Sequence, residues 1–384
     1  MTADEEFLTE LRGLAREFGD MLSPTALTVD RDPGQARMLL DSGLPWRQLM
    51  GLPAEYNPDP LRVGGRSVYL DKAVEQVTVL EELARVDAGA VLALPGPSMS
   101  GFVVSELGDR AQRERYFGRL AESPTWTFFG MTEPGHGSDP ASMSTTVRPD
   151  GAGGYRLTGT KRFVGNGARA AVGVVFARRR SGPLGVCAVL LETDRPGFTG
   201  VPLETIGLRG LQLSELRMRD VPLTDDDLLG RDRSATRQGM WAAVRTFNRY
   251  RPVVSSLALG VAQAAYDYTV AHCSRRTIDR LAGFEGRLRG TRALVLAAAR
   301  AADRDPADGT LASAAKIRAT RLAEELTLEA VECFGPGARW DHPPLDKYVR
   351  DARAFEFMEG TGTIQRLNLA QAYLSGRLDD DRAA

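Results

Sequence analysis

Histidine and cysteine are scarce in this chain of 384 residues. The three histidines (His136, His272 and His342) have neither the HxxxH nor the HExxH spacing with which zinc enzymes hold their metal. The three cysteines are odd in number, lie far apart and form no CxxC pair, which indicates reduced thiols rather than a disulfide framework. We therefore expect no metal site, and a reducing compartment, the cytoplasm.

Several motifs with a known physical role are also missing. There is no GxSxG elbow, no GxxxxGK[ST] phosphate loop and no GxGxxG turn, which disfavours a serine hydrolase, a P-loop enzyme and a Rossmann crevice. No run approaches the roughly 18 apolar residues of a membrane helix, and the acidic start MTADEEFLTE lacks the layout of a secretory signal. The net charge of −1 excludes a bulk polycation for nucleic acid. Only four of the 49 basic residues are lysine, which we attribute to coding bias.

The hydrophobic periodicity divides the chain into three zones. Helical spacing dominates to about residue 120, with a Pro/Gly-rich break at 51–68 that we predict to be a loop. Short β-branched runs between turn residues follow to about residue 225, which is typical of an antiparallel sheet or small barrel. Long Ala- and Leu-rich helices then return, one of them expected to begin at Pro252. The predicted fold is an α+β multidomain protein with an N-terminal helical domain (1–122), a middle β domain (123–228) and a C-terminal helical bundle (229–384).

The first candidate site segment is TEPGHGSD, residues 132–139. Pro-Gly followed by Gly-Ser-Asp forces a turn, in which consecutive amides and hydroxyls can face an anion or the polar edge of a ring. On these residues alone, a plain connecting loop is the favoured interpretation.

The second segment is GTKRFVGNG, residues 159–167, which predicts a strand that ends in a turn. Phe163 could pack flat on a planar cofactor, and the Gly-Asn-Gly turn could bring backbone close to it. The alternative is a hairpin with a core phenylalanine, which this segment alone favours.

The third segment is FEFMEGTGTIQR, residues 355–366. Glu359 stands among Phe and Met residues, and an apolar environment makes a carboxylate a stronger base. In a chain so poor in histidine, a carboxylate is the natural general base. Thr361 or Thr363 can cap the helix that follows and leave free amides for a partly negative ligand. A helix-initiating Glu on a solvated face explains these residues equally well.

Taken together and in this order, the three segments resemble the acyl-CoA dehydrogenase family of flavoproteins, over about residues 70–375. TEPGHGSD is similar to the family's T-E-P-x-x-G-S-D flavin loop, and KRFVGN is similar to its K-x-W-I-T-N strand end. Residues 197–230 resemble the stretch that closes its β domain, and residues 334–371 resemble its C-terminal cofactor and base region.

The resemblance implies an oxidoreductase with FAD bound between the β domain and the helical bundles of two subunits. It implies that Glu359 takes the α proton of an acyl thioester while the β hydrogen leaves as hydride to flavin N5. The implied substrate residues are Asn248 and Arg251. The implied cofactor residues are Thr132, Ser138, Phe163, Gly165, Arg275, Gly335, Gly337, Thr361 and Gln365.

Several positions depart from the family pattern. Gly165 stands where the family usually has Thr, Phe163 replaces Trp, and Asn248 stands where many members have Asp. The segment after Arg275 is altered and short. Such departures suggest an unusual acyl carrier, for example an acyl carrier protein of a specialised pathway. Tyr250 occupies the place of an alternative catalytic Glu of some members, so Glu359 has no obvious rival.

Two other classes stay open at this point. The missing threonine at Gly165 is compatible with a flavin oxidase or monooxygenase, and the altered segment after Arg275 is compatible with a non-catalytic binding protein. As partners we expect an acyl-CoA or acyl carrier protein thioester, electron-transfer flavoprotein or O2 as acceptor, and a second copy of the chain in a homodimer or homotetramer.

Overall fold

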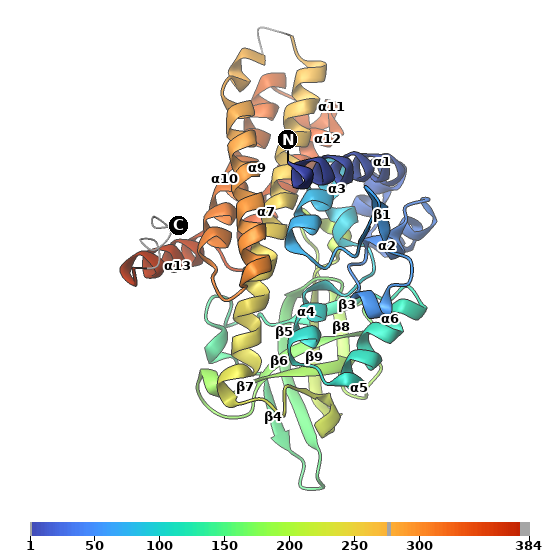
Figure 1. The fold of residues 1–384 in the computed structure, drawn as a ribbon, viewed down its shortest axis with the longest axis vertical. Helices are drawn as coiled ribbons and strands as arrows, with labels where there is room; N and C mark the ends of the chain where they lie inside the picture. Colours follow the sequence, from blue (N-terminus) through green and yellow to red (C-terminus); the bar gives the residue numbers. More distant parts are fainter. Residues whose placement is uncertain (1, 275–277, 377–384) are drawn as a thin grey trace.

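The computed structural model describes residues 2–274 and 278–376, which fold into a helical part, a β-sheet and a second helical part (Figure 1). The sheet forms one half of the molecule, and the long C-terminal helices rise from it beside the N-terminal helices. This helix–sheet–helix order confirms the predicted α+β multidomain fold.

The N-terminal part packs around α3, which contacts both α1 and α7. A capping box of Thr2 and Glu5 starts α1. Segment 51–68, predicted to be a loop, contains the antiparallel hairpin β1–β2. Its three-residue strands are too short to give a periodicity signal. The bounds are α1 (Ala3–Arg31), η1 (Pro33–Asp41), α2 (Trp46–Leu49), η2 (Ala54–Tyr56), β1 (Leu61–Val63), β2 (Arg66–Val68), α3 (Ala73–Leu92), α4 (Ser98–Leu107), α5 (Arg110–Arg113), η3 (Glu114–Gly118) and α6 (Arg119–Glu122).

The middle sheet has the strand order β10-β7-β6-β4-β5-β9-β8, with β3 also paired to β6. Most neighbours are antiparallel, as expected, but β3 and β4 run parallel to β6, which the sequence pattern did not indicate. A helix rather than a tight hairpin precedes β3, so no turn fixes its direction. Within the described residues β8 and β10 do not pair, and the sheet stays open instead of closing into a barrel. The bounds are β3 (Thr127–Gly130), β4 (Thr146–Pro149), β5 (Tyr155–Val164), β6 (Val172–Arg178), β7 (Val186–Glu192), β8 (Phe198–Pro202), β9 (Ser214–Leu223) and β10 (Leu228–Leu229).

The C-terminal part is organised by α7, which packs against α3, α9 and α10 and is therefore buried along most of its length. The prediction that a helix begins at Pro252 is wrong, because α7 begins at Gly239 and Pro252 lies inside it. Proline has no backbone N–H to donate, so the helix ladder lacks one hydrogen bond there. The bounds are α7 (Gly239–His272), α9 (Phe284–Arg304), α10 (Thr310–Phe334), α11 (Ala338–Asp341), α12 (Pro343–Ala354), η10 (Phe355–Phe357) and α13 (Gly362–Leu374).

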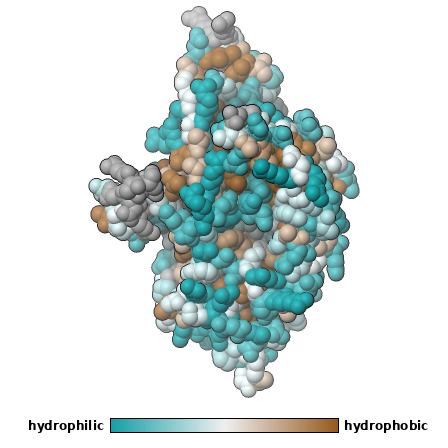
Figure 2. Space-filling model, viewed as in Figure 1, coloured by the Kyte–Doolittle hydropathy of each residue, from teal (hydrophilic) through white to brown (hydrophobic). Residues whose placement is uncertain are grey.

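Hydrophilic side chains cover most of the face in Figure 2, and apolar side chains gather in its helical half. Among residues 2–274 and 278–376, no helix combines the length and the hydropathy that a bilayer-spanning segment needs.

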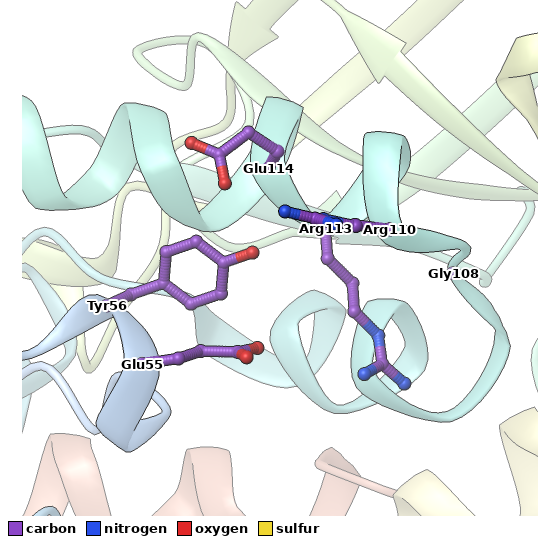
Figure 3. A pocket seen from close by; sticks show the side chains of 6 residues that line it. All are labelled: Glu55, Tyr56, Gly108, Arg110, Arg113 and Glu114. Atoms are coloured by element: carbon purple, nitrogen blue, oxygen red, sulfur yellow. The ribbon is translucent and has the colours of Figure 1, made fainter.

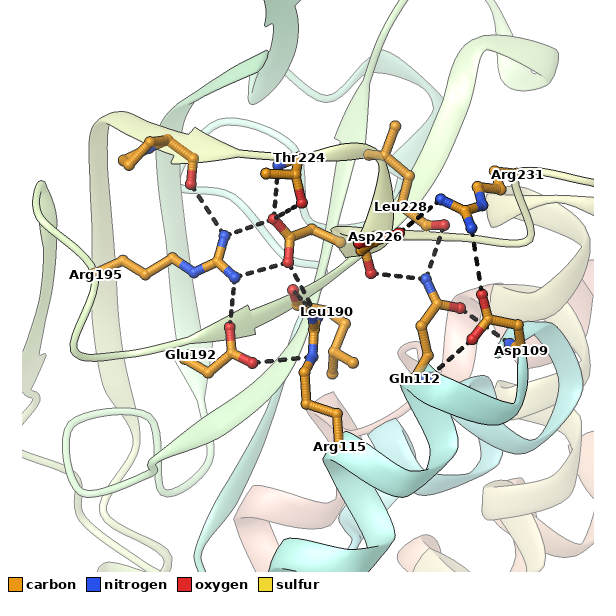
Figure 4. Close-up of polar contacts among 12 residues, drawn as sticks. Asp109, Gln112, Arg115, Leu190, Glu192, Arg195, Thr224, Asp226, Leu228 and Arg231 are labelled. Atoms are coloured by element: carbon orange, nitrogen blue, oxygen red, sulfur yellow. Dashed lines mark hydrogen bonds and ion pairs between the residues drawn. The ribbon is translucent and has the colours of Figure 1, made fainter. Parts of the chain in front are cut away.

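A polar network that includes Arg115, Arg195 and Thr224 ties the N-terminal helices to the sheet (Figure 4). Asp227 is its centre. Its carboxylate, with 1% of the side chain exposed, accepts from Arg195 at 2.6 Å and from Arg115 of η3 at 3.0 Å. The backbone N–H of Thr224 donates to it at 2.8 Å. Burial opposes the charge, but bonds from Arg195, Thr224 and Arg115 outweigh it and lower the pKa of Asp227.

We expect Asp227→Asn to lower the free energy of unfolding by about 3 kcal/mol, because two arginines lose their buried partner. Because the pKa of Asp227 is lowered on folding, its contribution is present above pH 3.8 and is lost as the pH falls through the folded value. Urea unfolding at pH 7 and pH 3 measures both effects. Asp226→Asn is the control, since Asp226 is 76% exposed and its carboxylate forms an exposed ion pair with Arg231. Equal effects of the two substitutions would contradict the central role of Asp227.

Candidate active site

Glu359 lies in the turn 355–361, between α12 and α13. Thr361 caps α13, with its Oγ1 accepting from the backbone N–H of Ile364 at 3.5 Å. Glu359 (φ 49°) and Gly360 (φ 94°) are both left-handed. This conformation costs glycine little but costs a residue with a Cβ about 1–2 kcal/mol. Surrounding contacts must therefore hold Glu359 in place.

Three side chains from three helices bind the carbonyl oxygens of this turn. Arg251 of α7 donates from Nε to the Glu359 oxygen at 3.2 Å. Gln365 of α13 donates from Nε2 to the Glu359 oxygen at 3.0 Å and to the Gly360 oxygen at 2.9 Å. Lys316 of α10 donates from Nζ to the Gly360 oxygen at 2.7 Å. These donors fix the turn against α7, α10 and α13.

The Glu359 carboxylate is shielded and incompletely bonded. Its Oε2 is buried and has no hydrogen-bond partner among the described residues. Burial raises the pKa of Glu359 to about 7, although Lys316 and Arg251 pull it downward. Burial likewise lowers the pKa of Lys316 to about 8 and that of Arg251 to about 10. A carboxyl group that titrates near neutrality, with an oxygen free to accept a proton, is suited to general base chemistry.

The two predicted substrate residues lie beside this turn and bond to each other. Asn248 accepts from Nη1 of Arg251 at 2.6 Å and donates to the Pro306 oxygen at 3.0 Å. Both polar atoms of the Asn248 side chain are therefore engaged within the protein. Tyr250 is also near Glu359, whose charge helps to raise the pKa of the phenol after burial. Its hydroxyl donates to the Ser98 oxygen at 2.8 Å.

The predicted segment 132–139 leaves β3 beside the end of β5. The Thr132 oxygen accepts from the backbone N–H of Arg162 at 2.8 Å. Glu133 of this segment forms an ion pair with Lys161 of β5, with 2.9 Å between Oε1 and Nζ. The side chains of Lys161 and Glu133 are 0% and 1% exposed. Burial alone would raise the pKa of Glu133, but Lys161 and hydrogen bonds lower it to about 2. Sequence reasoning did not find this pair, although one charged residue near the start of each of the two segments was a signal.

The outer side of segment 132–139 is exposed and leaves space for another group. Ser138 is exposed, and a Cβ at Gly135 or Gly137 would meet no heavy atom within 4 Å. Phe163 is 57% exposed in a left-handed conformation (φ 58°), so the alternative of a core phenylalanine is wrong. An exposed aromatic ring and an open loop of amides and hydroxyls, at the ends of neighbouring strands, fit a planar cofactor with a polar edge.

Gly165 has a steric reason to be glycine. A Cβ there would lie 2.7 Å from Cδ1 of Leu211, which belongs to η6 (Arg209–Leu211). The side chain of Leu211 thus fills the space that a threonine at this position would need.

We expect Gly165→Thr to lower the free energy of unfolding by about 1–3 kcal/mol through overpacking against Leu211. Leu211→Ala removes the clash, so the double variant should lose at least about 1 kcal/mol less than the sum of the single variants. Thermal unfolding of the four proteins measures this coupling. Additivity within about 0.5 kcal/mol would show that Leu211 is not what excludes threonine.

The remaining predicted residues lie elsewhere. Gly335 (φ 79°) and Gly337 (φ 89°) follow α10, in conformations that favour glycine. Arg275 lies outside the described residues. The structure brings Glu359, Arg251, Asn248, Thr361 and Gln365 together. Thr132, Ser138, Phe163 and Gly165 form a second group at the sheet. No hydrogen bond or ion pair between described residues joins the two groups.

Two hollows lie on the surface, and Glu359 is not among the residues that line either of them. One of about 530 Å³ lies between η2 and α5 and contains none of the predicted site residues (Figure 3). The other, of about 500 Å³, lies between α10 and the outer side of the turn that carries Glu359. Its lining includes Thr320, Glu356 and Gly362.

Comparison with known proteins matches all three parts of the chain. The family models for the N-terminal, middle and C-terminal domains of acyl-CoA dehydrogenase match residues 8–123, 128–221 and 237–374. The short-chain-specific acyl-CoA dehydrogenase of Megasphaera elsdenii is 29% identical, over 94% of this chain and 96% of that protein. Cyclohexane-1-carbonyl-CoA dehydrogenase of Geobacter metallireducens is 30% identical, over 77% of this chain and 80% of that protein.

Solved structures give the same result. Butyryl-CoA dehydrogenase from Megasphaera elsdenii superposes with a TM-score of 0.83 at 27% identity, over 97% of this chain and 99% of that one. A structure described with the electron transferring flavoprotein of Acidaminococcus fermentans superposes with a TM-score of 0.84 at 26% identity. The match covers 97% of this chain and 98% of that one.

Fold and comparisons together define a flavoprotein oxidoreductase that acts on CH–CH groups and uses FAD. The chain belongs to the acyl-CoA dehydrogenase family.

Proposed function

We propose that this protein dehydrogenates an acyl thioester between Cα and Cβ, with Glu359 as the base that takes the α proton. The observation that carries the proposal is the buried, unpartnered Oε2 of Glu359, on a carboxyl group whose pKa is raised to about 7. A base with a pKa near the working pH combines a large deprotonated fraction with proton affinity. A carboxylate in a solvated surface position would have neither the shielding nor the raised pKa.

Each group at the turn has a part in this proposal. Arg251 and Gln365 bind the Glu359 carbonyl oxygen, so the carboxylate keeps one direction during proton transfer. The burial of Oε2 shields that oxygen from water, a competing proton source. FAD, when bound, supplies the acceptor for the β hydride.

At the sheet, we propose that Thr132 and Ser138 bind polar parts of the cofactor and that Phe163 and Gly165 lie along its ring. The open loop and the exposed Phe163 ring support this assignment. Thr361 and Gln365 would close the site. Gly335, Gly337 and Arg275 are proposed to contact the FAD of a second subunit.

For the substrate, we propose a coenzyme A thioester, because the named relatives act on such thioesters. Arg251 and Asn248 are proposed to lie along the thioester. An acyl carrier protein thioester remains the second candidate, since Asn248 is neutral and already bonded within the protein. Electron-transfer flavoprotein is the proposed acceptor.

We propose a homodimer or homotetramer. The support is a set of exposed apolar side chains on and near α13, because a monomer rarely leaves such residues together in water. They are Phe357, Leu367, Tyr373 and Leu374.

The test is anaerobic mixing of the purified yellow protein with a panel of acyl-CoA and acyl carrier protein thioesters. Loss of flavin absorbance with at least one thioester is the expected result, and its identity gives the carrier. Rapid reoxidation by O2 with a hydroxylated product would instead favour a flavin oxidase or monooxygenase, the function that the Gly165–Leu211 arrangement leaves open. A protein that binds no flavin would overturn the proposal.

A further inference from the structure

Lys316 is a fully buried lysine with an unusual set of partners. Its side chain is 0% exposed, and its Nζ donates to the carbonyl oxygens of Glu356 at 3.1 Å and Gly360 at 2.7 Å. No carboxylate oxygen of the described residues lies within 4.0 Å of it. The two other buried lysines, Lys161 and Lys347, each pair with a carboxylate at 3.0 Å or less. A buried charge without a close counterion costs several kcal/mol, so its retention calls for a function.

The position of Lys316 indicates that function. Its two acceptors, Glu356 and Gly360, lie on either side of Glu359 in the chain, so one ammonium group ties both arms of the turn to α10. Between these arms Glu359 adopts a left-handed conformation that a residue with a Cβ avoids. Arg251 and Gln365 bind only the later part of the turn, at Glu359 and Gly360. One ammonium group of Lys316 joins the earlier arm to the later one, and the Glu356 carboxylate adds a local bond from the backbone N–H of Gly362 at 2.6 Å.

We propose that Lys316 is a positioning residue for the base: it holds the turn so that Glu359 points its carboxylate at Cα of the substrate, and its charge keeps that carboxylate ionised. The proposal rests on the proposed role of Glu359. The charge of Lys316 favours the ionised form of Glu359, and Glu359 in turn favours the charged form of Lys316. The other groups that face this pair are Arg251 and Tyr250 of α7 and Glu356 of η10.

The test is Lys316→Met in the full-length holoprotein, which keeps the length of the side chain and removes both bonds and the charge. We expect kcat to fall about 100-fold at pH 7, as for a misplaced catalytic group, with KM changed less than about threefold. The acidic limb of the kcat profile should move to higher pH, because Glu359 loses a cation that lowers its pKa. A merely structural role would lower the yield or the melting temperature without moving this limb.

Thr320→Val is the matched control. Thr320 is buried one turn further along α10, and its hydroxyl donates to the Lys316 backbone oxygen at 2.9 Å. It should leave the pH profile unchanged. If Lys316→Met fails to fold, Lys316→Gln decides, since it keeps a donor and loses the charge. An upward shift of its acidic limb supports the proposal, and an unshifted limb overturns it.

Glu359→Gln separates this inference from the proposed function. If Glu359→Gln is inactive while Lys316→Met keeps the wild-type kcat and pH profile, only the role of Lys316 is refuted. If Glu359→Gln is fully active, the proposed base is wrong, and any loss in Lys316→Met has another cause.

Discussion

Glu359→Gln is expected to slow flavin reduction by an acyl thioester by roughly 10²- to 10⁴-fold, the range that a general base contributes. Glutamine has the same shape and leaves the backbone bonds from Arg251 and Gln365 in place. The variant should therefore fold, bind FAD and stay yellow. Anaerobic stopped-flow absorbance measures the rate. Glu285→Gln is the control, because Glu285 is 64% exposed on α9 and forms a surface ion pair with Arg289.

The pH dependence provides a second check on the same residue. The base works only when deprotonated, and burial raises the pKa of Glu359 to about 7. The reduction rate should therefore rise as the pH increases through about 7 and then level off. Glu359→Gln should remove this limb. A rate that stays flat between pH 5 and 8 would show that no group with such a pKa controls the step.

Lys161→Met is expected to lower the free energy of unfolding by about 3–5 kcal/mol, because it leaves the buried Glu133 carboxylate without its cation. Glu133 also accepts from the backbone N–H groups of Ser144 and Thr145, at 2.6 and 2.9 Å. The loop 132–139 should therefore loosen, and purified protein should hold less FAD. Urea unfolding and the ratio of flavin to protein absorbance measure the two effects.

Lys72→Met is the control for Lys161→Met, because the Lys72 side chain is 66% exposed and its nearest carboxylate, on Glu75, is 3.8 Å away. It should change stability by less than about 0.5 kcal/mol. A pH effect accompanies the pair: the pKa of Glu133 is lowered on folding, so its contribution is present above pH 4.5 and is lost as the pH falls toward about 2. A small effect of Lys161→Met, equal to that of Lys72→Met, would contradict the account.

Periodicity and turn residues predicted much of the fold, because long helices and short β runs leave a local pattern. The helix after Thr361, for example, begins where the Gly-Thr-Gly-Thr run places its cap. Local sequence patterns did not predict the features that depend on contacts between residues far apart in the chain. Pro252 lies inside α7 because α3, α9 and α10 bury the helix on several sides, which outweighs the cost of one lost hydrogen bond. The parallel direction of β3 likewise depends on β6, more than 40 residues away.

The residues of the candidate site also fall into those that the local sequence indicates and those that only the fold brings together. Glu359 and Phe163 could be singled out from their neighbours in the sequence. Lys316 could not, because it lies 43 residues from Glu359 in an ordinary Ala-rich helix. The rarity of lysine, which the composition led us to attribute to coding bias, was the available signal. Lys161, Lys316 and Lys347 are all buried, and each fixes a junction between distant segments.

Incorporation of solvent deuterium at Cα tests most directly whether Glu359 removes a proton from carbon. The thioester that bleaches the flavin is incubated with holoprotein in D2O without an electron acceptor, and mass spectrometry follows its α position. We expect the wild-type protein to introduce deuterium at Cα and the Glu359→Gln protein, still yellow, to introduce none above the background without protein. Equal incorporation by the two proteins would contradict the assignment of Glu359 as the base.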